Sequence, residues 1–226
     1  MSAALLLAPG AGADRSQSAL VAIDRAVSAL GVAVGRMDFP YRKAGRKAPD
    51  REPVLLAAVA DEARALCSSS GVDPSRLALG GRSMGGRICS MAVADGLPGL
   101  ALVLVSYPLH PPGRPDRLRT AHFGRLVVPC LFVSGTRDAF ASRDELEGAT
   151  RAIPGPVTHA WIDGKDHGMR GADDEVAETV AGWLGALVSG GAASRGSVSP
   201  RSEAPRGALR SGRVAPRSGG RRAARP

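Results

Sequence analysis

The feature that most constrains the fold is the regular alternation of short apolar runs with longer amphipathic stretches. The apolar runs have the length and composition of strands that are buried on both faces of a sheet. They cover residues 4–8, 32–39, 76–80, 100–107, 129–135 and 158–163. The stretches between and after them show helical periodicity and cover residues 16–30, 53–69, 84–94, 142–153 and 172–188. This order predicts an α/β fold with about six parallel strands and helices on both faces of the sheet.

The charge of the chain is concentrated at its C-terminal end. The formal net charge of the whole chain is +9. Nine arginines and one glutamate lie from Gly190 onward, whereas residues 1–189 contain 21 basic and 20 acidic side chains. We therefore predict a globular domain over 1–189 and a disordered basic tail over 190–226. The tail has no aromatic residues for base stacking, so it is either a solvated extension or a non-specific contact for acidic partners.

Cysteine usage and hydropathy indicate a protein of a reducing compartment. Cys67, Cys89 and Cys130 are odd in number, far apart and placed in apolar segments, which predicts buried free thiols rather than disulfides or metal ligands. No apolar run approaches the roughly 20 residues of a membrane span. The apolar start of the chain lacks the basic region of a secretion signal and is interpreted as a strand. We expect a cytoplasmic protein without membrane contact.

The segment "LALGGRSMGGRICSM" places Ser83 between an apolar run and a helical stretch. A serine in the pattern G-x-S-x-G on a sharp turn from strand to helix is typical of an exposed nucleophile, with Gly81 and Gly85 leaving room for the turn. The same residues also fit a serine that only caps the N-terminus of the following helix. The motif alone does not decide between the two interpretations.

A serine nucleophile needs a general base and an acid that orients it. Among the four histidines, His167 directly follows the last predicted strand, and Asp138 follows the fifth. The order Ser83, Asp138, His167, each at the end of a strand, is the order of an α/β-hydrolase. The alternatives are a turn or capping role for Asp138 and a surface-loop role for His167. They would require three coincidences at three strand ends, so we favour a catalytic triad.

Two backbone amides are expected to bind the oxyanion. One is the N–H of Met84, which follows the proposed nucleophile. The other should come from the turn after the first strand, where "APGAGAD" suggests Ala11, with Gly12 as the neighbouring candidate. An ordinary strand-to-helix turn would contain glycine as well.

The connections around this site predict an open rim. About twenty residues separate Tyr107 from Val127, which is too few for a helical cap domain. We place Tyr41, Arg82 and Tyr107 at the substrate rim. Basic residues near it either favour an anionic substrate or are ordinary solvated charge, and they are Arg42, Lys43, Arg46, Lys47, Arg51, Arg82 and Arg87.

Six blocks of the sequence carry a resemblance to a known family. They are "LLLAPGAGAD", "RMDFPYRKAGRKAPDR", "LGGRSMGGRICSM", "SYPLHPPGRPDRLRTAHF", "PCLFVSGTRDAF" and "WIDGKDHGM", in that order. Over residues 3–188 the chain resembles the compact α/β-hydrolases of the testis-expressed protein 30 type, which include the hydrolase-like domain of the third regulatory subunit of the NSL histone-acetyltransferase complex and are related to dienelactone-hydrolase-like proteins. The resemblance implies an α/β-hydrolase fold without a cap domain and a triad of Ser83, Asp138 and His167.

Two function classes follow from these observations. The first is a serine hydrolase, an esterase or acyl hydrolase that acts on a small ester or acyl substrate through an acyl-enzyme, with neither cofactor nor metal. The second is a hydrolase-fold binding or scaffold protein with little or no turnover that recruits partners through its basic tail. A complete set of triad residues favours the first.

Overall fold

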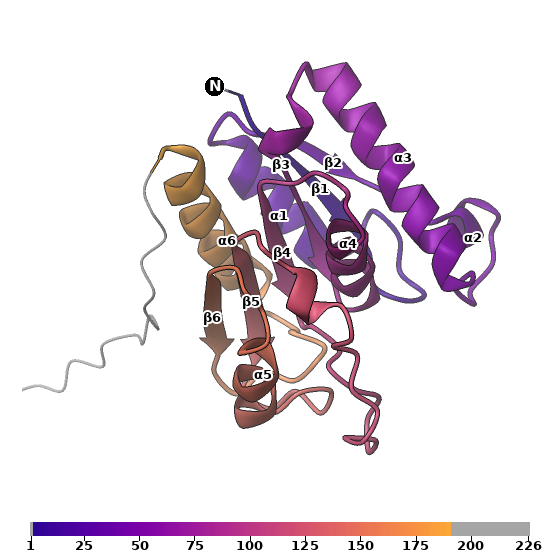
Figure 1. The fold of residues 1–226 in the computed structure, drawn as a ribbon, viewed down its shortest axis with the longest axis vertical. Coiled ribbons are helices and arrows are strands. Elements are labelled where there is room, and N and C mark those ends of the chain that lie inside the picture. Colours follow the sequence, from indigo (N-terminus) through magenta and orange to yellow (C-terminus); the bar gives the residue numbers. More distant parts are fainter. Residues whose placement is uncertain (1, 191–226) are drawn as a thin grey trace, which may run out of the picture.

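The computed structural model describes residues 2–190, so most of the predicted tail lies outside the described residues. Its centre is one sheet of six parallel strands in the order β2-β1-β3-β4-β5-β6 (Figure 1). The prediction of an α/β fold with a parallel sheet is confirmed. The strands are β1 (Ala4–Ala8), β2 (Ala33–Arg36), β3 (Leu77–Arg82), β4 (Ala101–Val105), β5 (Cys130–Gly135) and β6 (Val157–Ile162).

Helices cover both faces of this sheet because successive strand residues point to opposite sides. In β1, Leu6 packs in the same core cluster as residues of α3 (Glu52–Ser70), α4 (Met84–Ala94) and α5 (Arg143–Thr150). Its neighbours Leu5 and Leu7 pack with α1 (Ser18–Ser28) and α6 (Asp173–Val188) on the other face. The inner strands β1 and β4 are therefore apolar and buried on both faces, as the sequence pattern predicted, whereas the edge strands β2 and β6 are only half-buried and contain polar residues.

Most elements lie within a few residues of their predicted bounds, and the largest differences follow Arg36. The predicted strand over 32–39 is shorter because the chain leaves the sheet after Arg36 and starts a short helix, α2 (Pro40–Lys43). Pro40 at the first turn favours this start, since its missing N–H is not needed there. Two further 3₁₀ turns, η1 (Pro74–Arg76) and η2 (Phe123–Arg125), were not predicted.

The topology determines where a ligand can bind. Strand β1 lies between β2 and β3, so the chain moves outward from β1 in both directions. In open parallel sheets the crevice at the carboxyl ends of such strands is the usual ligand site. Within residues 2–190 no helical cap covers these ends, because β4 and β5 are joined by a loop with only the turn η2.

Two further expectations concern the thiols and the membrane. Cys67, Cys89 and Cys130 are buried free thiols, as predicted. Burial raises the pKa of Cys89 and of Cys130 to about 12. None of the helices in the described part of the chain is long and apolar enough to span a membrane.

Candidate active site

Ser83 occupies a strained turn between β3 and α4. Its backbone has φ 51° and ψ −118°, a region that non-glycine residues rarely adopt. A Cβ atom at Gly81 would lie 2.0 Å from the backbone oxygen of Ala8, and one at Gly85 would lie 2.2 Å from the same oxygen. Both glycines are therefore needed for β1 to pass this close to the turn. Ser83 holds the N-cap position of α4 but makes no side-chain capping hydrogen bond, so the capping interpretation is wrong.

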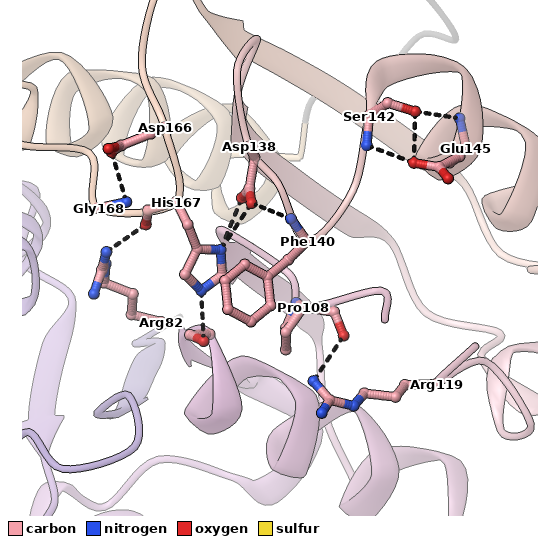
Figure 2. Close-up of polar contacts among 11 residues, drawn as sticks. Arg82, Pro108, Arg119, Asp138, Phe140, Ser142, Glu145, Asp166, His167 and Gly168 are labelled. Carbon is pink, nitrogen blue, oxygen red and sulfur yellow. Dashed lines mark hydrogen bonds and ion pairs between the residues drawn. The ribbon is translucent and has the colours of Figure 1, made fainter. Parts of the chain in front are cut away.

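Ser83, His167 and Asp138 form one hydrogen-bonded chain, of which Figure 2 labels His167 and Asp138. Ser83 Oγ lies 2.8 Å from His167 Nε2. On the other side of the ring, His167 Nδ1 lies 2.9 Å and 3.0 Å from the two carboxylate oxygens of Asp138. Because an ionised carboxylate only accepts hydrogen bonds, this network assigns the proton to Nδ1 and leaves Nε2 free to accept the Ser83 hydroxyl proton.

Close packing between loops brings His167 to Asp138. A Cβ atom at Gly135 would lie 2.1 Å from the backbone oxygen of Lys165, so only glycine at the end of β5 allows the loop after β6 to approach. The N–H of Arg137 donates to the same Lys165 oxygen at 2.8 Å. Asp166, the other carboxylate near His167 in sequence, accepts instead from the N–H of Gly168 at 2.8 Å.

The side chains of His167 and Asp138 differ in exposure. The side chain of Asp138 is 1% exposed and that of His167 is 19% exposed, so the carboxylate is shielded while the imidazole borders solvent. Phe140 stacks on the His167 ring with centroids 3.9 Å apart, and its N–H donates to Asp138 Oδ1 at 2.8 Å. This one residue therefore fixes both the imidazole and the carboxylate. Phe140 was not predicted as a site residue, because stacking across loops leaves no local sequence pattern.

The predicted oxyanion donors lie near Ser83, but their amides are used differently. Met84 is the first residue of α4, so its N–H has no acceptor within the helix. The N–H of Gly12 donates to the hydroxyl of Tyr41 at 3.2 Å, and that of Gly10 donates to Gln17 Oε1 at 3.1 Å. Ala11 lies between these two anchored amides and lines the cleft together with Ser83. Ala11 is therefore favoured over Gly12 as the second donor.

A cleft of about 450 Å³ opens beside Ser83. Of the three predicted rim residues, only Arg82 lines it. Tyr41 and Tyr107 are 0% and 1% exposed, so their assignment to the substrate rim is corrected. Their hydroxyls instead support the backbone of the site from the core side. Tyr41 accepts from the amide of Gly12, and Tyr107 donates to the backbone oxygen of Arg119 at 2.7 Å. A tyrosine next to proline looks the same in sequence whether its ring points outward or into the core.

Most of the basic residues predicted near the rim form ion pairs with carboxylates. Arg42 pairs with Asp14, Lys43 with Glu62, Arg46 with Asp50 and Arg87 with Glu52, at distances between 2.6 and 3.3 Å. Of these four, only Arg87 also lines the cleft. Gln17 and Arg119 also line the cleft, and neither was predicted from the sequence as a site residue.

The remaining histidines are not in the site. His110 lies 3.5 Å from Glu145, His122 contacts Ser90, and His159 contacts Thr150. Among residues 2–190, no group of three or more His, Cys, Asp or Glu side chains is placed to hold a metal ion.

Comparison with known proteins supports the fold and gives the family. Residues 1–182 match the alpha/beta hydrolase domain family, and the chain belongs to that family. An alpha-beta serine hydrolase homologue from Coxiella burnetii superposes with a TM-score of 0.68 at 18% identity, over 80% of this chain and 85% of that one. Dienelactone hydrolase from Anabaena variabilis superposes with a TM-score of 0.66 at 18% identity, over 81% of this chain and 85% of that one. Est1E from Butyrivibrio proteoclasticus superposes with a TM-score of 0.65 at 13% identity, over 83% of this chain and 89% of that one. At these identities the likeness supports the shared fold and not a shared substrate.

Proposed function

We propose that this protein is a serine hydrolase that cleaves carboxylic esters or related acyl compounds through an acyl-enzyme. One observation carries the proposal, which is the unbroken hydrogen-bonded chain from Ser83 Oγ through both nitrogens of His167 to the buried carboxylate of Asp138. The other parts of the site support it. The serine lies on a strained turn at the end of a strand, beside an open cleft.

In the acylation step, Ser83 Oγ attacks the carbonyl carbon while its proton moves to His167 Nε2. Asp138 accepts the Nδ1–H and stabilises the imidazolium that forms. The carbonyl oxygen becomes an oxyanion, which the N–H groups of Met84 and Ala11 bind. A donor of this kind contributes about 3 kcal/mol of transition-state stabilisation. His167 then returns its proton to the departing alcohol oxygen, and the acyl group stays on Ser83.

Deacylation repeats these roles with water as the nucleophile. His167 Nε2 takes a proton from water as its oxygen attacks the acyl carbon, and the same two amides bind the second oxyanion. Collapse of this intermediate releases the carboxylic acid and returns the proton to Ser83 Oγ. The open cleft gives water direct access to the ester of the acyl-enzyme.

The proposal is tested with short 4-nitrophenyl esters, because they report acyl transfer without requiring the natural alcohol. We expect nitrophenolate release by the wild type and about a 10³- to 10⁴-fold lower kcat/KM in His167→Gln. His110→Gln removes a histidine outside the cleft and should stay within about twofold of the wild type. Equal rates in wild type and His167→Gln would contradict the proposal and favour a hydrolase-fold binding protein without useful turnover.

Two finer assignments belong to the same proposal. We place the chain in the compact group of the testis-expressed protein 30 type, because the tyrosines of its "FPYR" and "SYPLHPPG" blocks anchor two loops of the site to the core. Tyr41 supports the oxyanion loop, residues 9–17 after β1, and Tyr107 supports the rim loop, residues 106–129 between β4 and β5. We also place it in the cytoplasm, where its three buried free thiols would stay reduced.

A further inference from the structure

The cleft beside Ser83 has an unbalanced positive lining. Three of its residues are arginines (Arg82, Arg87 and Arg119), and none is an aspartate or glutamate. Two of the three guanidinium groups already have partners. Arg82 donates to the backbone oxygen of His167 at 2.5 Å and is attracted by carboxylates, most strongly by that of Asp173. Arg87 forms an ion pair with Glu52 at 3.2 Å.

Arg119 differs from both because it has no carboxylate partner within residues 2–190. Its only side-chain hydrogen bond in that range is a long one of 3.4 Å to the backbone oxygen of Pro108. Burial lowers the pKa of Arg119, and the positive charge of Arg87 lowers it further. The fold therefore keeps two like charges close together on the cleft wall, one of them without a counter-charge.

The fold also fixes the backbone of Arg119. Its N–H donates to the oxygen of Leu109 at 2.8 Å, and its own oxygen accepts from the Tyr107 hydroxyl at 2.7 Å. Tyr107 is buried against Phe123 and Phe132, with ring centroids 5.4 and 5.7 Å away. The rim loop is thus anchored to the core directly at the base of Arg119. Figure 2 shows Arg119 and Arg82 on either side of the His167 ring.

We propose that Arg119, with Arg87 beside it, is an anion subsite that selects ester substrates carrying a carboxylate. This inference rests on the proposed hydrolase function and adds the substrate class. The substrate carboxylate would lie on the part of the molecule that extends from Ser83 along the rim loop. The acyl carbon would stay at Ser83, between the oxyanion amides and His167.

A carboxylate suits this wall for two reasons. The planar guanidinium presents paired N–H donors that match the two oxygens of a carboxylate. A carboxylate also supplies the counter-charge that the lining lacks, whereas a neutral substrate would leave the repulsion between Arg87 and Arg119 in place. A charge-assisted contact of this kind corresponds to about a tenfold preference or more.

The first test compares two 4-nitrophenyl esters of adipic acid whose far end is either the free carboxylate or the uncharged carboxamide. In the wild type, kcat/KM for the acid should exceed that for the amide by about tenfold, and added salt should reduce the ratio. In Arg119→Gln the ratio should fall close to one. Arg117→Gln removes an exposed arginine of the same loop that does not line the cleft, and it should keep the wild-type ratio. A ratio that is unchanged in Arg119→Gln, or near one in the wild type, would overturn the proposal.

The second test does not depend on turnover. Calorimetric titration of Ser83→Ala with adipate at low salt should show saturable binding, which the additional change Arg119→Gln should abolish. If adipate binds in this way but no ester is hydrolysed, the hydrolase proposal fails and the anion subsite stands. If esters are hydrolysed but adipate does not bind, the anion subsite fails and the hydrolase proposal stands.

Discussion

Among residues 2–190, two serine–histidine pairs have the same length but different surroundings. Ser83 Oγ and His167 Nε2 are 2.8 Å apart, and so are Ser90 Oγ and His122 Nε2. Ser90 lies inside α4, only seven residues after Ser83. A search for serine and histidine within hydrogen-bond distance would therefore return both pairs.

The difference lies in what surrounds each pair. Ser90 and His122 are buried, and the Ser90 hydroxyl donates to the backbone oxygen of Arg87 at 2.8 Å, so it accepts from His122. Burial, together with the positive charges of Arg87 and Arg125, lowers the pKa of His122 to about 4. This histidine resists the proton that a general base must take up.

The first pair has the groups that the second lacks. His167 has a carboxylate at its second nitrogen, and Ser83 borders a cleft on a strained turn. The serine–histidine distance alone therefore says little about the reactivity of the serine. The charge behind the histidine and the access to the serine separate a proposed nucleophile from a structural hydrogen bond. The second pair ties the rim loop to α4.

The largest predicted difference comes from deleting each hydroxyl in turn. Ser83→Ala should lower kcat for 4-nitrophenyl butyrate by about 10⁴-fold or more, because it removes the hydroxyl that would form the acyl-enzyme. Ser90→Ala should keep turnover within about threefold. It should lower the free energy of unfolding by about 1–3 kcal/mol in urea titrations, since it leaves the buried His122 N–H without an acceptor. A comparable loss of turnover in the two variants would remove the distinction between the pairs.

The carboxylate behind His167 is tested by Asp138→Asn. An amide at this position can donate to Nδ1 and stabilise the wrong tautomer, so kcat should fall by about 10³- to 10⁴-fold. Asp166→Asn is the matched control, because Asp166 is next to His167 in sequence but bonds to the Gly168 amide. It should change kcat by less than about threefold. Equal effects of the two substitutions would argue against Asp138 as the orienting acid.

The buried Ser90–His122 pair should make the free energy of unfolding depend on pH. An unfolded chain protonates His122 near pH 6.5, whereas burial lowers its pKa in the folded state to about 4. The unfolded state therefore binds more protons between these values, and stability is lost as the pH falls from about 6.5 to about 4. The full loss is about 3 kcal/mol. Urea denaturation of wild type and His122→Gln over this range measures it, and the variant should lack this contribution. An identical pH dependence in both proteins would show that His122 is not buried in its neutral form.

The smallest predicted effect concerns Tyr41, which supports the loop beside Ser83 through the amide of Gly12. Tyr41→Phe removes the acceptor for the Gly12 amide and should lower kcat about three- to tenfold, with little change in KM. Such a pattern would mean that the loop positions its donors for the transition state. A rise in KM at constant kcat would instead indicate that Tyr41 shapes substrate binding.

Local sequence patterns were enough to predict the sheet and to place Ser83, Asp138 and His167 at one edge of it. Apolar runs such as Ala4–Ala8 are buried on both faces, so their pattern depends on the sheet and not on loop details. Ser83, Asp138 and His167 each lie within a few residues of the end of a strand, so the parallel topology brings them to one edge, where packing between the loops completes their approach.

Features that depend on how loops fold over the core could not be predicted in this way. Tyr41 and Tyr107 are buried because their loops turn inward, and a sequence window around either tyrosine contains no sign of that direction. The same holds for Phe140 stacked on His167, and for Arg119, whose lack of a carboxylate partner among the described residues becomes visible only once the other charges of the cleft are placed.

The proposed function requires that Ser83, and not Ser90, is the activated nucleophile. Intact-mass measurement after treatment with a small fluorophosphonate tests it most directly, on wild type, Ser83→Ala and Ser90→Ala side by side. We expect one adduct on the wild type and on Ser90→Ala, none on Ser83→Ala, and a modified peptide that contains Ser83. An adduct that persists in Ser83→Ala, or a folded wild type that takes up none, would contradict it.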